Sequence, residues 1–178
     1  MSAIQVMLDL ETMGTASDSA IIAIGAVKFT DTAVLEKFYV NVSLQSCIDV
    51  GLKIDGDTVM WWMQQSEEAR ASFTDNAVHI NLALQMFSKW INGDKQVWGN
   101  GASFDNAILS SAYSKCQLSQ PWKFWNDRCY RTIKSLYPEI KLQRVGTYHK
   151  ALDDAESQAL HLIEIMKEET NDSCKASS

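Results

Sequence analysis

Three strand-like segments joined by short connections begin the chain, and they restrict its fold more than any other feature. They run from Val6 to Thr12, from Ala20 to Phe29 and from Val34 to Val42, and the second is rich in branched apolar residues. Short connections join antiparallel neighbours, whereas parallel strands need a crossover of about a dozen residues or more. The sequence therefore predicts an antiparallel meander whose second strand is buried.

Helical patterns replace the strands after this point. The stretch 43–56 has the composition of a loop, and Asp57 is predicted to cap a helix over 58–65. A second helix is expected over 75–91, where apolar residues recur every four positions: Val78, Leu82, Met86 and Trp90.

The second half of the chain mixes strands and helices. A short strand is expected over 96–100, a helix over about 104–115 and another helix over 127–137, which Pro138 ends. The last helix carries an apolar stripe at Leu152, Ala155, Ala159, Leu162 and Met166. The pattern predicts one α/β domain over residues 1–168, with a mixed sheet and helices on both faces, and a flexible tail over 169–178.

Composition narrows the location and the partners. The chain has 178 residues and a net charge of −6, which argues against gripping a long duplex through a basic face. No apolar stretch is long enough to cross a membrane, and no signal peptide pattern is present. The cysteines, Cys47, Cys116, Cys129 and Cys174, lack zinc-site spacing, so a cytoplasmic protein with reduced thiols is expected.

Two carboxylates interrupt the first strand. Asp9 and Glu11 are two residues apart, so in a strand they project from the same side. Like charges this close raise each other's pKa, and a divalent cation would neutralise them. A solvated strand edge would explain an isolated pair equally simply.

Acidic residues recur at two later points. Asp105 stands where a helix should begin just after the 96–100 strand, and Asp153 and Asp154 stand in the first turn of the last helix, preceded by His149. Acidic residues at a helix start also favour the helix dipole, and a lone histidine in a loop is often a surface residue. Each position therefore has an ordinary structural explanation when it is taken alone.

Taken in order, the three segments resemble the motifs of the DnaQ-like, DEDDh superfamily of 3′–5′ exonucleases. This resemblance implies a ribonuclease H-like fold with a mixed five-stranded sheet, in which parallel strands follow the antiparallel meander. The D-x-E motif matches Asp9 and Glu11. The N-x-x-x-F-D motif matches Asn100, Phe104 and Asp105. The H-x-A-x-x-D-A motif matches His149, Ala151, Asp154 and Ala155. Within the superfamily, the pair Trp61-Trp62 is similar to a signature of small bacterial and phage enzymes, a group in which RNA is somewhat favoured over DNA.

The resemblance implies a metal-dependent hydrolysis. It implies that Asp9, Glu11, Asp105 and Asp154 bind two divalent cations, Mg²⁺ or Mn²⁺, and that His149 is the general base. Asp154, not its neighbour Asp153, has the family spacing.

The substrate implied is the 3′ end of single-stranded or short RNA or DNA. Residues expected to contact it are Thr12, Met13, Gly14, Trp61, Trp62 and Phe104. At most one of the two tryptophans should face the site, and packing in the core is the alternative for each, as it is for Phe104.

Two further alternatives stay open at this point. A catalytically inactive nucleic-acid-binding or regulatory module would have lost a metal ligand or the histidine, and an acidic structural protein would not need the histidine motif. The aromatic stretch 121–125 is either an exposed contact of a homodimer or a loop folded onto the core.

Overall fold

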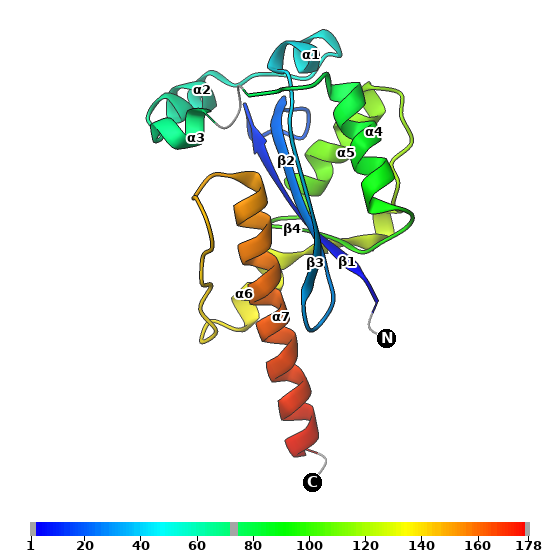
Figure 1. Ribbon diagram of the computed structural model, residues 1–178, viewed down its shortest axis with the longest axis vertical. Coiled ribbons are helices and arrows are strands. Elements are labelled where there is room, and N and C mark those ends of the chain that lie inside the picture. Colours follow the sequence, from blue (N-terminus) through cyan, green and yellow to red (C-terminus); the bar gives the residue numbers. More distant parts are fainter. Residues whose placement is uncertain (1–2, 72–74, 177–178) are drawn as a thin grey trace.

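The computed structural model describes residues 3–71 and 75–176, with side chains up to residue 169 except that of Ala71. Its centre is a five-stranded sheet with the order β3-β2-β1-β4-β5 (Figure 1). The first three strands pair antiparallel, and β1, β4 and β5 pair parallel. The strands are β1 (Gln5–Thr12), β2 (Ile21–Phe29), β3 (Val34–Asn41), β4 (Val97–Gly99) and β5 (Asp127–Cys129). The predicted α/β class, meander and mixed sheet are confirmed.

Helices cover both faces of the sheet (Figure 1). One face packs against α4 and α5, and the other packs against α6 and α7. The helical elements are α1 (Leu44–Asp49), α2 (Gly56–Met63), α3 (Glu67–Ala71), α4 (Ile80–Ile91), α5 (Asp105–Lys115), the 3₁₀ turn η1 (Phe124–Asn126), α6 (Tyr130–Leu136) and α7 (Ala151–Ala176).

The alternating direction of the side chains along β1 explains why each face of the sheet has its own hydrophobic core. Val6, Leu8 and Leu10 join the cluster that contains α4 and α5, whereas Met7 faces α7. Residues two apart share a face, so Asp9 and Glu11 lie on the α7 side with Met7. The metal-binding candidates are thus directed toward the last helix.

Several predicted boundaries are wrong. A short helix, α1, lies inside the predicted 43–56 loop because the Ser43 side chain caps it. The α2 helix begins at Gly56, and its cap is Asp55, which accepts from the Thr58 N–H, rather than Asp57. The segment 127–129 forms β5 before α6 begins.

The buried face of α4 also differs from the prediction. Ile80, Leu84, Phe87 and Ile91 are buried, whereas Leu82 and Met86 of the predicted stripe are exposed. A constant step of four rotates by about 40° each time around a helix of 3.6 residues per turn, so such a stripe drifts off one face. Alternating steps of four and three return to the same side.

The C-terminal segment differs from the predicted flexible tail. The α7 helix continues past Met166 to Ala176, through the segment that the sequence assigned to a tail, and the Cys174 side chain is outside the described part.

The aromatic stretch 121–125 is partly buried and partly exposed. Trp122 is buried in the core, and Phe124 and Trp125 are exposed. Of the helices in the described ranges, not one combines the length and apolarity that crossing a bilayer requires.

A close approach between β2 and α7 positions the site. A Cβ atom on Gly25 would lie 2.2 Å from the Ala151 carbonyl carbon and 2.3 Å from the Leu152 nitrogen. Gly25 is the partner of Asp9 in the β1–β2 register. Only a residue without a side chain allows the first turn of α7 to rest beside Asp9 on the sheet.

Candidate active site

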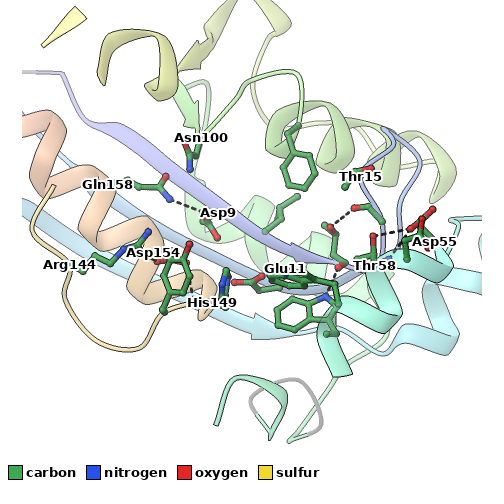
Figure 2. A pocket seen from close by; sticks show the side chains of 18 residues that line it. Asp9, Glu11, Thr15, Asp55, Thr58, Asn100, Arg144, His149, Asp154 and Gln158 are labelled. Atoms are coloured by element: carbon green, nitrogen blue, oxygen red, sulfur yellow. Dashed lines mark hydrogen bonds and ion pairs between the residues drawn. The ribbon is translucent and has the colours of Figure 1, made fainter. Parts of the chain in front are cut away.

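The acidic end of β1 faces the first turns of α7 (Figure 2). Gln158 donates from Nε2 to the Asp9 Oδ1 atom at 2.8 Å. Gln158 and Asp154 are four residues apart, so they share one face of the helix. The approach of α7 at Gly25 therefore delivers Asp154 and Gln158 to Asp9 together.

Asp105 reaches β1 from the other side of the site. The pairing of β1 with β4 ends at Leu8 and Gly99. Two residues further along β1, the Leu10 N–H donates to Asp105 Oδ1 at 3.1 Å. The Asp105 side chain is buried, and its Oδ2 atom is, among the described residues, one of the buried polar atoms without a hydrogen-bond partner. An unpaired buried carboxylate oxygen is costly, which is the condition that a bound cation relieves.

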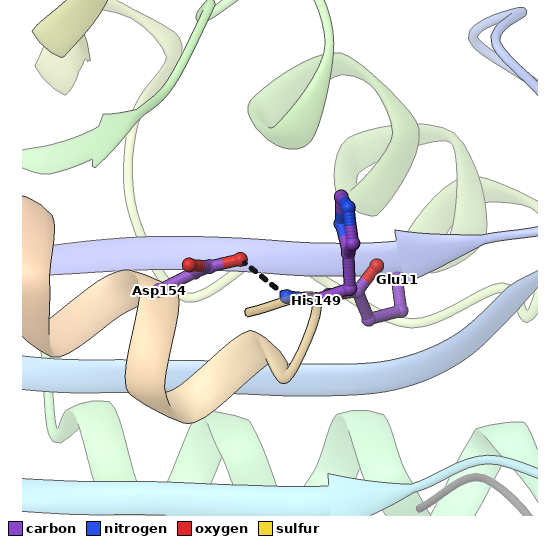
Figure 3. Close-up of side chains that lie close together, drawn as sticks. All are labelled: Glu11, His149 and Asp154. Carbon is purple, nitrogen blue, oxygen red and sulfur yellow. Dashed lines mark hydrogen bonds between the residues drawn. The ribbon is translucent and has the colours of Figure 1, made fainter. Parts of the chain in front are cut away.

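His149 completes a compact group with two of the acids (Figure 3). Glu11, His149 and Asp154 each offer one ligand atom within 4.8 Å of the others. The His149 N–H donates to Asp154 Oδ2 at 3.2 Å, and the backbone of His149 has a φ of 61°. This left-handed conformation is uncommon for a residue other than glycine, and such backbone outliers cluster at functional sites.

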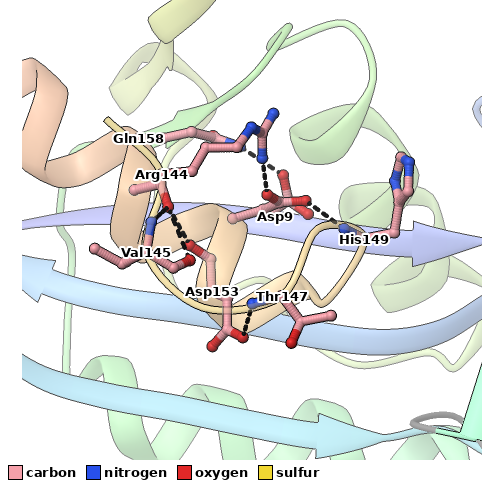
Figure 4. A network of polar contacts seen from close by, with 9 residues as sticks. Asp9, Arg144, Val145, Thr147, His149, Asp153 and Gln158 are labelled. Atoms are coloured by element: carbon pink, nitrogen blue, oxygen red, sulfur yellow. Dashed lines mark hydrogen bonds and ion pairs between the residues drawn. The ribbon is translucent and has the colours of Figure 1, made fainter. Parts of the chain in front are cut away.

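A set of hydrogen bonds holds the loop that carries His149 on the start of α7 (Figure 4). Asp153 Oδ2 accepts from the Thr147 N–H at 2.8 Å, and Ser157 Oγ accepts from the Val145 N–H at 2.9 Å. Gly146 has a φ of 69°, and a Cβ there would lie 2.3 Å from Asp153 Oδ2. Asp153 is thus directed to the loop, and Asp154 is directed to the acidic group, as the family spacing predicts.

Replacing Asp153 with alanine should lower kcat about tenfold and leave divalent-metal binding nearly unchanged, because it removes a support of the His149 loop but no carboxylate of the acidic group. Asparagine at the same position keeps an acceptor for the Thr147 N–H and should retain most activity. Steady-state kinetics with a titration of Mn²⁺ would check both variants. Full activity of Asp154→Asn together with an inactive Asp153→Asn would reverse the assignment of the two residues.

The acids raise one another's affinity for protons. Burial and the charges of Asp105, Glu11 and Asp154 hold the pKa of Asp9 well above its usual range. Burial, with Asp154 and Asp105, raises the pKa of Glu11 to about 8, and burial raises that of Asp105 to about 7. Burial also raises the pKa of Asp154, against the opposing effect of Arg144, and lowers the pKa of His149. The hard oxygen donors and their repulsion fit divalent cations such as Mg²⁺ or Mn²⁺.

Without metal, the protein should become less stable as the pH rises from about 4 to about 8. The native state keeps protons on Glu11 and Asp105 that the unfolded chain has already released, so each step upward in pH favours unfolding. Urea unfolding in EDTA at pH 5 and pH 8 would measure this. The Glu11→Gln variant should show a shallower slope, whereas Glu164→Gln, an exposed position on α7, should follow the wild type.

The acidic group opens into a cavity of about 690 Å³ (Figure 2). Of the predicted substrate-contacting residues, Met13 does not line it, because its side chain packs into the core and its backbone bonds to Ala20 and Asp55. The predicted residues that do line it are Thr12, Gly14, Trp61, Trp62 and Phe104. Asp105 is buried and is not among the lining residues.

The two tryptophans have different environments. Trp62 is only 4% exposed, and its Nε1 donates to the Thr12 carbonyl oxygen at 2.9 Å, so it supports the turn after β1. Trp61 is 40% exposed, and its ring meets the His149 ring edge-on at 4.9 Å. Trp61 is therefore the tryptophan with a ring surface available to a ligand.

Other lining residues were not found from the sequence. They include Arg144, Tyr148, Gln158, Asp55 and Thr58. The spacing of Gln158 from Asp154 is a signal that could have identified it. Arg144 and Tyr148 lie in an irregular loop, where no periodicity shows which way a side chain points.

A mixed sheet of this order, with helices on both faces, has the fold of the ribonuclease H-like exonucleases. The nuclease domain of 3′hExo, a DEDDh family member bound to rAMP, matches 94% of this chain and 93% of its own with a TM-score of 0.63 at 12% identity. The chain belongs to the family of the Rv2179c-like 3′–5′ exoribonuclease domain, whose model matches residues 4–166. It is a phosphodiester hydrolase.

Two relatives with sequences similar to this chain are a phage exonuclease and a bacterial DNA polymerase. An exodeoxyribonuclease of Enterobacteria phage T4 is 30% identical over an alignment of length 155 that covers 71% of this chain and 68% of that protein. A PolC-type DNA polymerase III of Listeria monocytogenes is 26% identical over an alignment of length 178 that covers 91% of this chain but 11% of that protein. This chain thus spans a small part of the polymerase.

Proposed function

We propose that this exonuclease removes nucleoside 5′-monophosphates from the 3′ end of single-stranded or short nucleic acid, with two divalent cations bound by Asp9, Glu11, Asp105 and Asp154. The observation that carries this proposal is the convergence of Glu11, Asp105 and Asp154 on Asp9, whose pKa their charges and its burial raise. The buried Oδ2 atom of Asp105, which has no hydrogen-bond partner among the described residues, supports it. Bound there, Mg²⁺ or Mn²⁺ would make water a better nucleophile and neutralise the scissile phosphate.

His149 is the general base in this proposal. Burial lowers its pKa, so the imidazole is neutral and accepts a proton near pH 7. Its position within 4.8 Å of Glu11 and Asp154 places the acceptor beside the proposed cation ligands. The His149 loop is anchored to α7 through Asp153 and Ser157, which keeps the ring in reach of the attacking water.

The terminal nucleotide would occupy the cavity beside these groups. The exposed ring of Trp61 offers a stacking surface for a base, and Gly14 and Thr12 form the adjacent wall. Phe104 packs against the core from the opposite side and borders the same space. Aromatic stacking depends little on base identity, so we expect cleavage with weak sequence preference.

RNA is the proposed preferred substrate, with DNA as the competing one. The family description names an exoribonuclease, whereas the T4 relative is an exodeoxyribonuclease. Discrimination would need a hydrogen bond to the 2′-hydroxyl, which a backbone group of the Glu11–Gly14 turn would supply in this proposal. Asp55 and Asp57 on the cavity wall add negative charge that disfavours long duplexes.

A degradation assay tests the reaction. The purified chain would be incubated with 5′-labelled single-stranded RNA and DNA of matched sequence in Mg²⁺, Mn²⁺ or EDTA, beside an Asp9→Asn control. A metal-dependent ladder that shortens from the 3′ end, absent from the control and formed faster on RNA, is expected. Faster loss of the DNA would reverse the preference, and no degradation of either strand would favour an inactive binding module.

That inactive module is the second candidate, and the site residues argue against it. Such a module typically loses a metal ligand or the histidine, and here each of the four acids and His149 is present.

Two other predictions remain open. The exposed pair Phe124 and Trp125 is the surface that supports a homodimer, and sedimentation as a monomer at micromolar concentration would oppose it. Action in the cytoplasm is supported by the free thiols of Cys47, Cys116 and Cys129.

A further inference from the structure

We infer that Arg144 exchanges between Asp154 and a phosphate group of the substrate, so that a cation bound at Asp154 frees the guanidinium to hold nucleic acid. This inference rests on the proposed function, because it assigns a role to Arg144 only if Asp154 binds a metal. It would make Arg144 a substrate-binding residue that is kept in place by the acidic group until the metal arrives.

Both carboxylate oxygens of Asp154 are engaged without a metal. Arg144 Nη1 donates to Asp154 Oδ1. The His149 N–H donates to Asp154 Oδ2 at 3.2 Å (Figure 3). A cation that binds this carboxylate must displace or weaken one donor. The His149 donor belongs to the backbone of an anchored loop, whereas the Arg144 side chain is 45% exposed beside an Asp154 side chain that is 11% exposed. The guanidinium is therefore the donor that can leave.

The charge of the cavity indicates where the guanidinium goes. Five acids line the cavity: Asp9, Glu11, Asp55, Asp57 and Asp154. Among the described residues of that wall, Arg144 is the only lysine or arginine. A phosphodiester entering this space needs positive charge, and the forked N–H groups of arginine match phosphate oxygens in pairs.

The surroundings of Arg144 allow the side chain to move while the backbone stays fixed. The neighbouring Val145 is bound through its N–H to Ser157 Oγ at 2.9 Å. The Arg144 guanidinium carbon lies 4.0 Å from the centre of the Tyr148 ring, which also lines the cavity. A cation–π contact can hold the guanidinium against this wall as it turns from Asp154 toward the cavity.

The exchange predicts changes of opposite sign in two affinities. Without Arg144, a cation meets no competitor at Asp154, so metal binding should tighten about twofold to fivefold, as expected for a partly exposed ion pair. Phosphate binding in the presence of metal should weaken by about tenfold, because a charged hydrogen-bonding partner is lost. A residue that only supported the loop would weaken both affinities when removed.

The test uses isothermal titration calorimetry on the full chain. Mn²⁺ is titrated first without nucleotide, and adenosine 5′-monophosphate is then titrated at saturating Mn²⁺. Arg144→Gln is compared with the wild type and with Lys141→Gln, which removes the same charge from an exposed position in the same segment. Arg144→Met, which keeps much of the aliphatic stem over Tyr148, is the second variant, should the glutamine substitution disturb folding by circular dichroism.

Tighter Mn²⁺ binding with weaker nucleotide binding in the Arg144 variants, and wild-type values for Lys141→Gln, would support the exchange. Mn²⁺ affinity in the Arg144 variants that is unchanged or reduced would overturn it, while the metal site itself would stand. A wild-type protein that binds no Mn²⁺ would overturn both the exchange and the proposed metal site.

Discussion

Replacing Asp9 with asparagine should abolish the metal-dependent activity and, at the same time, stabilise the metal-free protein. Burial and the charges of Asp105, Glu11 and Asp154 hold the pKa of Asp9 well above its usual range, so in the absence of a cation its charge opposes folding. Asparagine keeps the size of the side chain and its hydrogen bond with Gln158 but removes the charge. We expect a loss of kcat of at least about a hundredfold to a thousandfold, the range measured when a preorganised electrostatic contact in an enzyme is removed.

The two effects are measured separately and have opposite signs. Kinetics at saturating Mg²⁺ reports the first, and urea unfolding at pH 8 in EDTA reports the second. Glu164→Gln removes one negative charge from the exposed side of α7, so it separates a general charge effect from one at the site. An Asp9→Asn protein that is inactive and also less stable than the wild type would show that Asp9 supports the fold, which contradicts its assignment as a strained metal ligand.

Replacing Gly25 with alanine should destabilise the protein by about 3 kcal/mol or more and remove activity as a consequence. The new methyl group would lie 2.2 Å from the Ala151 carbonyl carbon and 2.3 Å from the Leu152 nitrogen, and these are backbone atoms that cannot change rotamer. The start of α7 would have to leave the sheet, and it would take Asp154 and Gln158 away from Asp9. The His149 loop, bound to the same turns of the helix, would follow.

Gly56→Ala is the matched control for this substitution. A Cβ at Gly56 meets no heavy atom within 4 Å, and the residue opens α2, where alanine is a good helix former. Urea midpoints for the two variants, with circular dichroism of the native state, give the comparison. If Gly25→Ala unfolded at the wild-type midpoint with activity intact, the contact between β2 and α7 would not be the element that positions the site.

Local periodicity explains which parts of the fold could be predicted. The alternation in β1 and the branched residues of β2 led to the meander, and the acid at the start of α5 was placed correctly, because each depends on neighbours within a few residues. The prediction of the buried face of α4 was wrong because two apolar patterns coexist on that helix, and only packing against the sheet decides which one is buried. The predicted N-cap of α2 was wrong because Asp55 and Asp57 are both suitable capping residues.

The sequence by itself supplied the residue types of the candidate site, namely the acids, the histidine and their order along the chain. The choice of Asp154 over Asp153 came from the spacing of the family motif that the sequence resembles. Only the tertiary structure decided that Gly25 admits α7 beside Asp9, that Asp105 completes the edge of β1 through Leu10, and that Arg144 pairs with Asp154. Such contacts join segments far apart in the chain. Their geometry depends on how whole helices and strands pack, and a local sequence pattern carries no information about that packing.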